Sequence, residues 1–257
     1  MSLGLGVDIG SLFTKAVVMR DGELVASLIA ETTGNVSEEI AGLIGKTLED
    51  AGVAASDLDA SAITGRGADA WQEAEYKYDD VSCIAAALKH IMPEVGMSLE
   101  IGGQSITALL LDGEGGIIDF MRNDKCASGS GKFLEVMSAA VGVSIEQLDE
   151  VVTRSTKKVP ISSQCGVFVE SEVITHVNEG EAVPDIVAGL CESVAKIIIS
   201  QALKFGMLED YTLTGGVAAL KAVTGRATPR INGNYREFPY DPRLVCAMGA
   251  ALMAVAE

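Results

Sequence analysis

Short apolar runs alternate with longer amphipathic stretches along this chain. The run at residues 5–11 ends in an acid, a glycine and a hydroxyl, which is typical of a strand that leads into a turn. Apolar positions at helical spacing predict helices over residues 37–51, 81–91 and 184–205. Strands and helices that alternate in this way predict an α/β fold.

A strand that ends in an acid-Ile-Gly sequence occurs twice. Asp8 and Gly10 are followed by an apolar run and an Asp-Gly turn, and Glu100 and Gly102 are followed by a second apolar run and a second Asp-Gly turn. The repetition predicts a duplicated α/β unit. Two such turns facing each other across a cleft would direct two carboxylates and two glycine turns at one point, which suits a metal-bound polyphosphate.

The last third of the chain adds a glycine turn and a closing helix. Residues 211–218 predict a strand followed by Gly215 and Gly216, a turn that can lie against a base or a ribose and is also an ordinary connection from strand to helix. Residues 248–255 predict a helix of small residues that packs closely on a sheet. No linker divides the chain, so we expect two lobes that share one cleft, residues 1–94 and 95–257, and allow the terminal helix to pack back on the first lobe.

Two cysteines lie in unusual surroundings. Cys126 precedes a glycine-rich turn in which Gly129 and Gly131 let a ligand approach the backbone, and Cys165 also stands just before an expected helix. Two thiols cannot hold an iron–sulfur cluster alone, but a two-fold dimer supplies four, so one reading is a cluster shared by two chains. The other reading is that both are small buried side chains, as we expect for Cys83, Cys191 and Cys246, and spacing alone does not decide between the two readings.

Composition narrows the function classes. The formal net charge of −17 argues against nucleic-acid binding, which needs clustered Lys and Arg. We find no apolar run of bilayer length and no signal-like leader, so we expect a cytoplasmic protein that does not bind membranes. Five cysteines in such a chain favour reduced thiols or metal ligands over a disulfide framework.

Together these motifs resemble a known family, the activator ATPases of 2-hydroxyacyl-CoA dehydratases and the related ATPase subunits of benzoyl-CoA reductases (BadF/BadG/BcrA/BcrD type). The resemblance runs from Leu5 to Ala254, and its two cysteine stretches are its most specific part, because sugar kinases of the same fold superfamily lack them. It rests on residues 8–11 (DIGS) with Lys15, 100–104 (EIGGQ), 126–134 (CASGSGKFL), Cys165 with 168–174 (FVESEVI), and 214–218 (TGGVA).

The resemblance implies an actin-like fold of two lobes and a homodimer that binds ATP or ADP with Mg²⁺. It also implies one [4Fe-4S] cluster between the subunits, held by Cys126 and Cys165, which passes an electron from a ferredoxin or flavodoxin donor to a dehydratase or reductase acceptor. By the same analogy Asp8 and Glu100 hold Mg²⁺ through water and help to place the attacking water. The phosphates would be contacted by Gly10, Ser11, Lys15, Gly102, Gly103 and Gln104, the adenosine by Gly215 and Gly216, and further cofactor contacts would come from Gly129, Gly131, Lys132 and Glu170.

Several positions depart from the family pattern. Glu100 stands where aspartate is usual, and Ser105 replaces a second aspartate, so ATP turnover is less firmly implied than cluster binding. Three functions therefore stay open: an ATP-dependent reductive activator, an ATPase subunit built permanently into a benzoyl-CoA reductase-type complex, and a small-molecule kinase of the same fold. The kinase alternative gives no role to the two cysteines.

Overall fold

The chain folds into two compact units, each built around a five-stranded sheet. The computed structural model describes residues 2–33, 36–123, 129–161, 165–206 and 210–257. Unit 1 contains Met1–Gly96, Leu109–Asp119 and Phe238–Glu257, and unit 2 contains Met97–Ala108 and Phe120–Glu237. The chain first leaves unit 1 after Gly96, close to the expected boundary after residue 94. The C-terminal segment Phe238–Glu257 belongs to unit 1.

Unit 1 has the strand order β3-β2-β1-β4-β5. β1 pairs antiparallel with β2 and parallel with β4, and β2 pairs antiparallel with β3. The Asp21-Gly22 turn between β2 and β3 has a positive φ at both residues, as a tight hairpin requires. Its elements are β1 (Leu3–Ile9), β2 (Phe13–Arg20), β3 (Glu23–Glu31), α1 (Val36–Ala51), β4 (Ala60–Thr64), β5 (Tyr76–Lys77), α2 (Asp80–Ile91) and α8 (Val245–Ala254).

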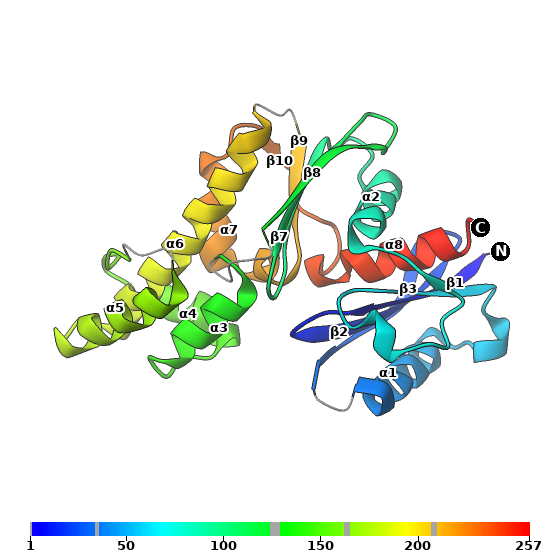
Figure 1. Cartoon of the computed structure of the whole chain (residues 1–257), viewed down its shortest axis with the longest axis horizontal. Coiled ribbons are helices and arrows are strands. Elements are labelled where there is room, and N and C mark those ends of the chain that lie inside the picture. Colours follow the sequence, from blue (N-terminus) through cyan, green and yellow to red (C-terminus); the bar gives the residue numbers. More distant parts are fainter. Residues whose placement is uncertain (1, 34–35, 124–128, 162–164, 207–209) are drawn as a thin grey trace. The chain divides into compact units, whose positions relative to one another are not determined.

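β1 presents two different faces because side chains alternate along a strand. Val7 and Ile9 pack with α1 residues such as Ile40 in one apolar cluster. The other face carries Gly4 and Gly6, where α8 lies so close that a Cβ on Gly6 would come within 2.0 Å of a carbonyl oxygen of the helix. Figure 1 shows α8 and α1 on opposite sides of these strands. The helix of small residues therefore packs on a sheet, as expected from the sequence.

Gly249 makes the same kind of close contact between α8 and α2. A Cβ at this position would lie 1.8 Å from the carbonyl oxygen of Cys83. We therefore expect Gly249→Ala to lower the free energy of unfolding by about 1–3 kcal/mol or more, because the two helices must move apart.

Urea unfolding measures this change, and Gly45→Ala is the matched control. Gly45 lies inside α1 with open space at its Cβ, so alanine there should stabilise the protein by up to about 1 kcal/mol. Equal free energies of unfolding for the two variants would contradict the close packing of α8.

Unit 2 has the strand order β10-β9-β6-β7-β8, in which β6 and β10 both pair parallel with β9. The helix expected just after Cys165 is present as α5, and α3 begins at Gly131 in the glycine-rich turn. Its elements are β6 (Met97–Ile101), β7 (Ile106–Leu111), β8 (Ile117–Asn123), α3 (Gly131–Ala139), α4 (Leu148–Thr153), α5 (Gly166–Asn178), α6 (Val183–Ala202), β9 (Asp210–Thr214), α7 (Lys221–Ala227) and β10 (Asn234–Tyr235).

The long helix α6 is the centre of the core of unit 2. Ile186, Val194 and Ile198 on this helix are fully buried, as the apolar stripe predicts. The sequence-based statement that no apolar run reaches bilayer length is wrong, because Val183–Phe205 is long and apolar enough by length and composition. A helix that is surrounded by other elements of a core is apolar on most of its circumference. A helix that spans a membrane has the same composition, so α6 passes the test for both.

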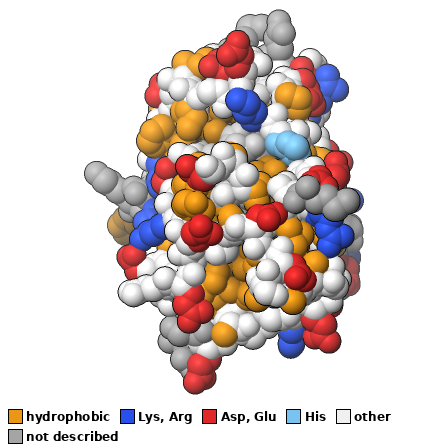
Figure 2. Space-filling view, turned by 90° about the vertical axis from the view of Figure 1, so that its right-hand side faces the viewer, with side chains coloured by type: hydrophobic (Ala, Val, Ile, Leu, Met, Phe, Trp, Pro, Cys, Tyr) orange, Lys and Arg blue, Asp and Glu red, His pale blue; other side chains and the backbone are white. Residues whose placement is uncertain are grey.

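The visible face in Figure 2 carries acidic side chains spread among apolar ones, with few Lys and Arg side chains between them. This distribution agrees with the net charge of −17. The expectation that the protein does not bind nucleic acid stays a prediction.

Candidate functional site

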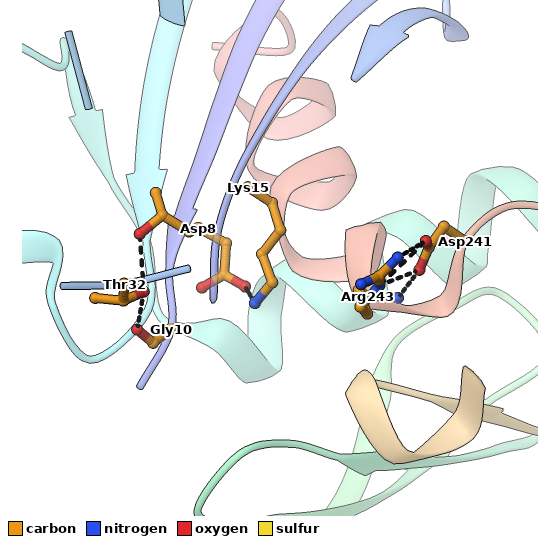
Figure 3. Close-up of polar contacts among 7 residues, drawn as sticks. Asp8, Gly10, Lys15, Thr32, Asp241 and Arg243 are labelled. Carbon is orange, nitrogen blue, oxygen red and sulfur yellow. Dashed lines mark hydrogen bonds and ion pairs between the residues drawn. The ribbon is translucent and has the colours of Figure 1, made fainter. Parts of the chain in front are cut away.

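The first acid-glycine turn lies at the end of β1 in unit 1. Asp8 is only 6% exposed, and its Oδ2 accepts a hydrogen bond of 2.7 Å from Nζ of Lys15 on the neighbouring strand β2. The strand register places Asp8 directly opposite Lys15, which explains the contact. Figure 3 shows the carboxylate and the ammonium pointing at each other at the strand end. A predicted metal ligand and a predicted phosphate ligand are thus neighbours.

The backbone after Asp8 forms a tight turn. The Gly10 N–H donates to the Phe13 carbonyl at 3.0 Å, and the Gly10 carbonyl accepts from Oγ1 of Thr32 at 2.9 Å. A Cβ on Gly10 would lie 2.9 Å from Nζ of Lys15, so the glycine makes room for the ammonium. Ser11 lies within this turn and is half-exposed. Thr32, which the sequence analysis missed, supports the turn from β3's end.

A second glycine turn, which follows β4, lies in close contact with Asp8. Gly65 has a φ of +93°, and a Cβ there would lie 2.3 Å from Oδ1 of Asp8 and 2.5 Å from the Ile9 carbonyl oxygen. No other residue type fits this combination of left-handed backbone and close approach. Gly65 therefore shapes the surroundings of the carboxylate, although no role was predicted for it from the sequence.

Unit 2 repeats this arrangement around Glu100 at the end of β6. The Gly102 N–H donates to the Ser105 carbonyl at 2.9 Å, which matches the Gly10 to Phe13 bond. Gly215 follows β9 with a φ of +84°, and a Cβ there would lie 2.5 Å from Oε1 of Glu100 and 2.5 Å from the Ile101 carbonyl oxygen. The predicted duplication is confirmed by this geometry. Each unit has a strand that ends in an acid, a glycine turn, and a second glycine, Gly65 or Gly215, packed against the acid.

The two copies differ in the residues around the acid. Thr107 on β7 follows Gly102 by the same number of residues as Lys15 follows Gly10. Thr107 is buried, and its hydroxyl accepts a hydrogen bond of 3.1 Å from Nε of Arg122. Glu100 is half-buried, Gln104 is exposed, and Gly216 begins a short 3-10 turn. The two turns are therefore related in backbone but differ in the side chains around the acid.

The turn after Glu100 is also joined to the start of α3. The Gly131 N–H donates to the Gly102 carbonyl at 2.9 Å, and the Lys132 N–H donates to the Gly103 carbonyl at 2.8 Å. Gly131 is buried, and Nζ of Lys132 pairs with Glu135 on the same helix. The first two amides of a helix have no partner within it, and here the turn supplies one for each.

The cysteine stretches are described only in part. Cys126 lies outside the described residues. Gly129 follows it with a φ of +89°, and a Cβ there would lie 2.8 Å from Ile197 and 3.1 Å from Ile106, so this backbone is packed against the core of unit 2. Cys165 is exposed and caps the N-terminus of α5, where its carbonyl accepts from the N–H groups of Phe168 and Val169. Glu170 is exposed on the same helix.

The donor chemistry of these positions fits the groups that the resemblance implies. The exposed Cys165 thiol offers the sulfur donor that an iron–sulfur cluster needs. Within the described ranges, no three His, Cys, Asp or Glu side chains gather as a metal site, so a cluster needs thiols beyond Cys165. Asp8 offers the hard carboxylate oxygens that Mg²⁺ prefers beside phosphates.

The other three cysteines are core residues, as predicted. Cys83 and Cys191 are fully buried, and Cys246 is 7% exposed. Burial raises the pKa of Cys83 and of Cys191 to about 12, so both thiols stay protonated at neutral pH.

Known proteins share both the sequence and the structure of this chain. The 2-hydroxyisocaproyl-CoA dehydratase activator of Clostridioides difficile is 38% identical over 257 residues, which covers 98% of this chain and 95% of that protein. The structure of the activator of the 2-hydroxyisocaproyl-CoA dehydratase from Clostridium difficile with bound ADPNP superposes with a TM-score of 0.92 at 35% identity, covering 99% of this chain and 94% of that chain.

More distant structures share the fold alone. A ROK family glucokinase from Streptomyces griseus in complex with glucose and AMPPNP has a TM-score of 0.60 at 13% identity, covering 100% of both chains. The expected actin-like α/β fold is confirmed by these neighbours. The model of the BadF/BadG/BcrA/BcrD ATPase family matches residues 5–254, and the chain belongs to this family.

Proposed function

We propose that this protein is an ATP-dependent reductive activator. It takes a low-potential electron from a ferredoxin or flavodoxin and delivers it to a 2-hydroxyacyl-CoA dehydratase or a related reductase. The similar activator from Clostridioides difficile and the ADPNP in its structural counterpart support the acceptor and the nucleotide. The observation that carries the proposal is the pair of hydrogen bonds from Gly131 and Lys132 to the turn at Gly102 and Gly103.

These two bonds connect the proposed phosphate turn to the cysteine stretch. α3 follows directly on the stretch that contains Cys126, so a movement of the turn at Gly102 and Gly103 is transmitted to the start of α3. A polyphosphate that contacts this turn would favour one position of its carbonyls, and hydrolysis would release that position.

The residues around Asp8 supply the chemistry on ATP. Lys15 holds one carboxylate oxygen of Asp8 at 2.7 Å and thereby fixes the side chain, and its ammonium is positioned to attract phosphate. Asp8 would then hold Mg²⁺ through water and orient the water that attacks the terminal phosphate. The turn from Gly10 to Phe13 presents backbone groups to the phosphates.

The iron–sulfur cluster, when bound by Cys126 and Cys165 of two chains, would supply one-electron transfer at low potential. Such a shared site requires a homodimer. Exposed apolar side chains on α5 support a covered face beside Cys165, namely Phe168 at 67%, Ile174 at 52% and Val177 at 46%. An acidic soluble surface rarely leaves large apolar residues this accessible on one helix unless something covers them.

Replacing Lys132 by proline tests the connection between turn and helix. Proline at this first-turn position removes the N–H that reaches Gly103 while the helix itself loses no hydrogen bond. We expect Lys132→Pro to hydrolyse ATP but to lose most of the effect of MgATP on the absorption or circular dichroism of the cluster.

Lys132→Ala is the matched control, because it keeps the amide and removes only the ion pair with Glu135. This variant should behave like the wild type in both measurements. If Lys132→Pro retains the full nucleotide effect on the cluster, the proposed route through α3 is wrong. An active, iron-free protein that phosphorylates a small molecule would instead support the kinase alternative.

A further inference from the structure

An arginine beside the first acid-glycine turn takes no part in the mechanism proposed above. Arg243 lies in the 3-10 turn Pro242–Leu244, just before α8. Its Nε donates to both carboxylate oxygens of Asp241 at 2.9 and 3.1 Å, and its Nη2 donates to Oδ2 at 2.6 Å. The Arg243 N–H also donates to Oδ1 of Asp241 at 2.9 Å. Figure 3 shows this pair near Lys15 in unit 1.

The guanidinium of Arg243 also lies over an aromatic ring. Its central carbon is 5.8 Å from the centroid of Phe13, within the range of a cation–π interaction. Phe13 closes the turn that begins at Gly10, because its carbonyl accepts the Gly10 N–H at 3.0 Å. The bond to Asp241 fixes the fork of the guanidinium, so the ring has a rigid partner.

Capping alone does not account for this arrangement. Asp241 already caps the 3-10 turn through the Arg243 N–H, and that contact needs no particular side chain at position 243. The ring contact needs a cationic side chain at position 243 and an aromatic ring at position 13. The corresponding turn in unit 2 has Ser105 where Phe13 stands, so the contact belongs to the first turn. The charge of Lys15 also acts on Asp241, which places the two ion pairs within electrostatic reach.

The electrostatics of Asp241 agree with a fixed ion pair. Burial acts to raise the pKa of the Asp241 carboxyl, but the hydrogen bonds and charge of Arg243, together with the charge of Lys15, lower the pKa below its usual range. The carboxylate therefore stays ionised at neutral pH and keeps the guanidinium in place.

We propose that Arg243 is a positioning residue for the nucleotide, because it holds the Gly10–Phe13 turn in its phosphate-binding form through the ring of Phe13. This inference rests on the proposed function of that turn. Because Asp241 neutralises the guanidinium, the contribution of Arg243 is to the position of the turn and not to the net charge of the site. The expected consequence is an effect on nucleotide affinity rather than on the chemical step.

Calorimetric titration with MgATP, combined with steady-state ATP hydrolysis, tests the inference. Arg243→Gln and Phe13→Leu should each raise the Kd for MgATP about three- to tenfold, the range that a cation–π contact allows, with kcat nearly unchanged. The Kd for MgATP of the double variant should not exceed the larger of the two single-variant values, because both substitutions remove the same contact. Phe13→Tyr retains the ring and should bind within about twofold of the wild type.

Arg236→Gln is the matched control. Arg236 also pairs with an aspartate, since its Nε donates to Oδ1 of Asp210 at 2.8 Å, but this pair lies in unit 2. It should leave the Kd for MgATP unchanged. An Arg243→Gln protein with a lower Tm but a wild-type Kd would show a purely structural role and overturn the inference. A wild-type protein that binds no MgATP would overturn the proposed function as well.

Discussion

Asp8→Asn is expected to reduce ATP hydrolysis roughly 10²- to 10⁴-fold, the size that loss of a general base or of a metal ligand produces. The amide keeps the shape of the side chain but loses the charge that Mg²⁺ and the attacking water need. The same change leaves the ammonium of Lys15 without its carboxylate at a position where the Lys15 side chain is only 13% exposed. We therefore also expect a loss of stability of about 3–5 kcal/mol.

A second substitution separates these two effects. Asp8→Asn combined with Lys15→Met removes both charges, so much of the stability should return while hydrolysis stays lost. Steady-state phosphate release and urea unfolding measure the two quantities. The control is Asp69→Asn, which breaks the exposed pair with Lys77 in the same unit and should change neither quantity. Hydrolysis that recovers in the double variant would show that Asp8 acts only through stability.

Cys165→Ala is expected to abolish cluster binding. Anaerobically prepared wild-type protein should contain about four irons per dimer, and the variant should contain almost none, because half of the thiolate ligands are removed. Cys165 is exposed, so the free energy of unfolding should change by less than about 0.5 kcal/mol. The loss of iron therefore cannot be attributed to misfolding.

Cys191→Ala provides the opposite control. Cys191 is fully buried in the core of unit 2, so its replacement should cost about 1 kcal/mol of stability and leave the iron content unchanged. Iron and sulfide analysis with absorption spectra before and after dithionite measures the cluster. Wild-type iron content in Cys165→Ala would contradict the ligand assignment.

Local patterns in the sequence predict the elements of both units well. The acid-Ile-Gly sequence predicts a turn in each unit, and both turns are present. Each is closed by the same backbone hydrogen bond, from Gly10 to Phe13 in unit 1 and from Gly102 to Ser105 in unit 2. The apolar stripes predict α1, α2 and α6, because a helix that packs on one side needs that spacing. The small residues of α8 predict its close packing, which Gly6 and Gly249 make possible.

Long-range contacts are what the sequence leaves hidden. The strands β2, β3 and β4 and the helix α1 lie between Asp8 and Gly65 in the sequence, and the parallel pairing of β1 with β4 brings the two residues together. The repeated Thr-Gly after β4 and β9 is a signal that could have found Gly65. Arg243 and Thr32 carry no such signal, because their contacts depend on how separate segments meet. The same α6 stripe that builds the core also passes for a membrane span by composition, since sequence does not show what surrounds a helix.

The most direct test of the account is whether the nucleotide changes the environment of the cluster. We would measure the rate at which an iron chelator removes iron from the anaerobic, reduced wild-type protein with MgATP, with MgADP and without nucleotide. Coupling from the turn at Gly102 and Gly103 through α3 predicts clearly different rates for MgATP and MgADP, and Lys132→Pro should make these rates equal. Identical rates in the wild-type protein, with both nucleotides shown to bind, would contradict the proposed coupling.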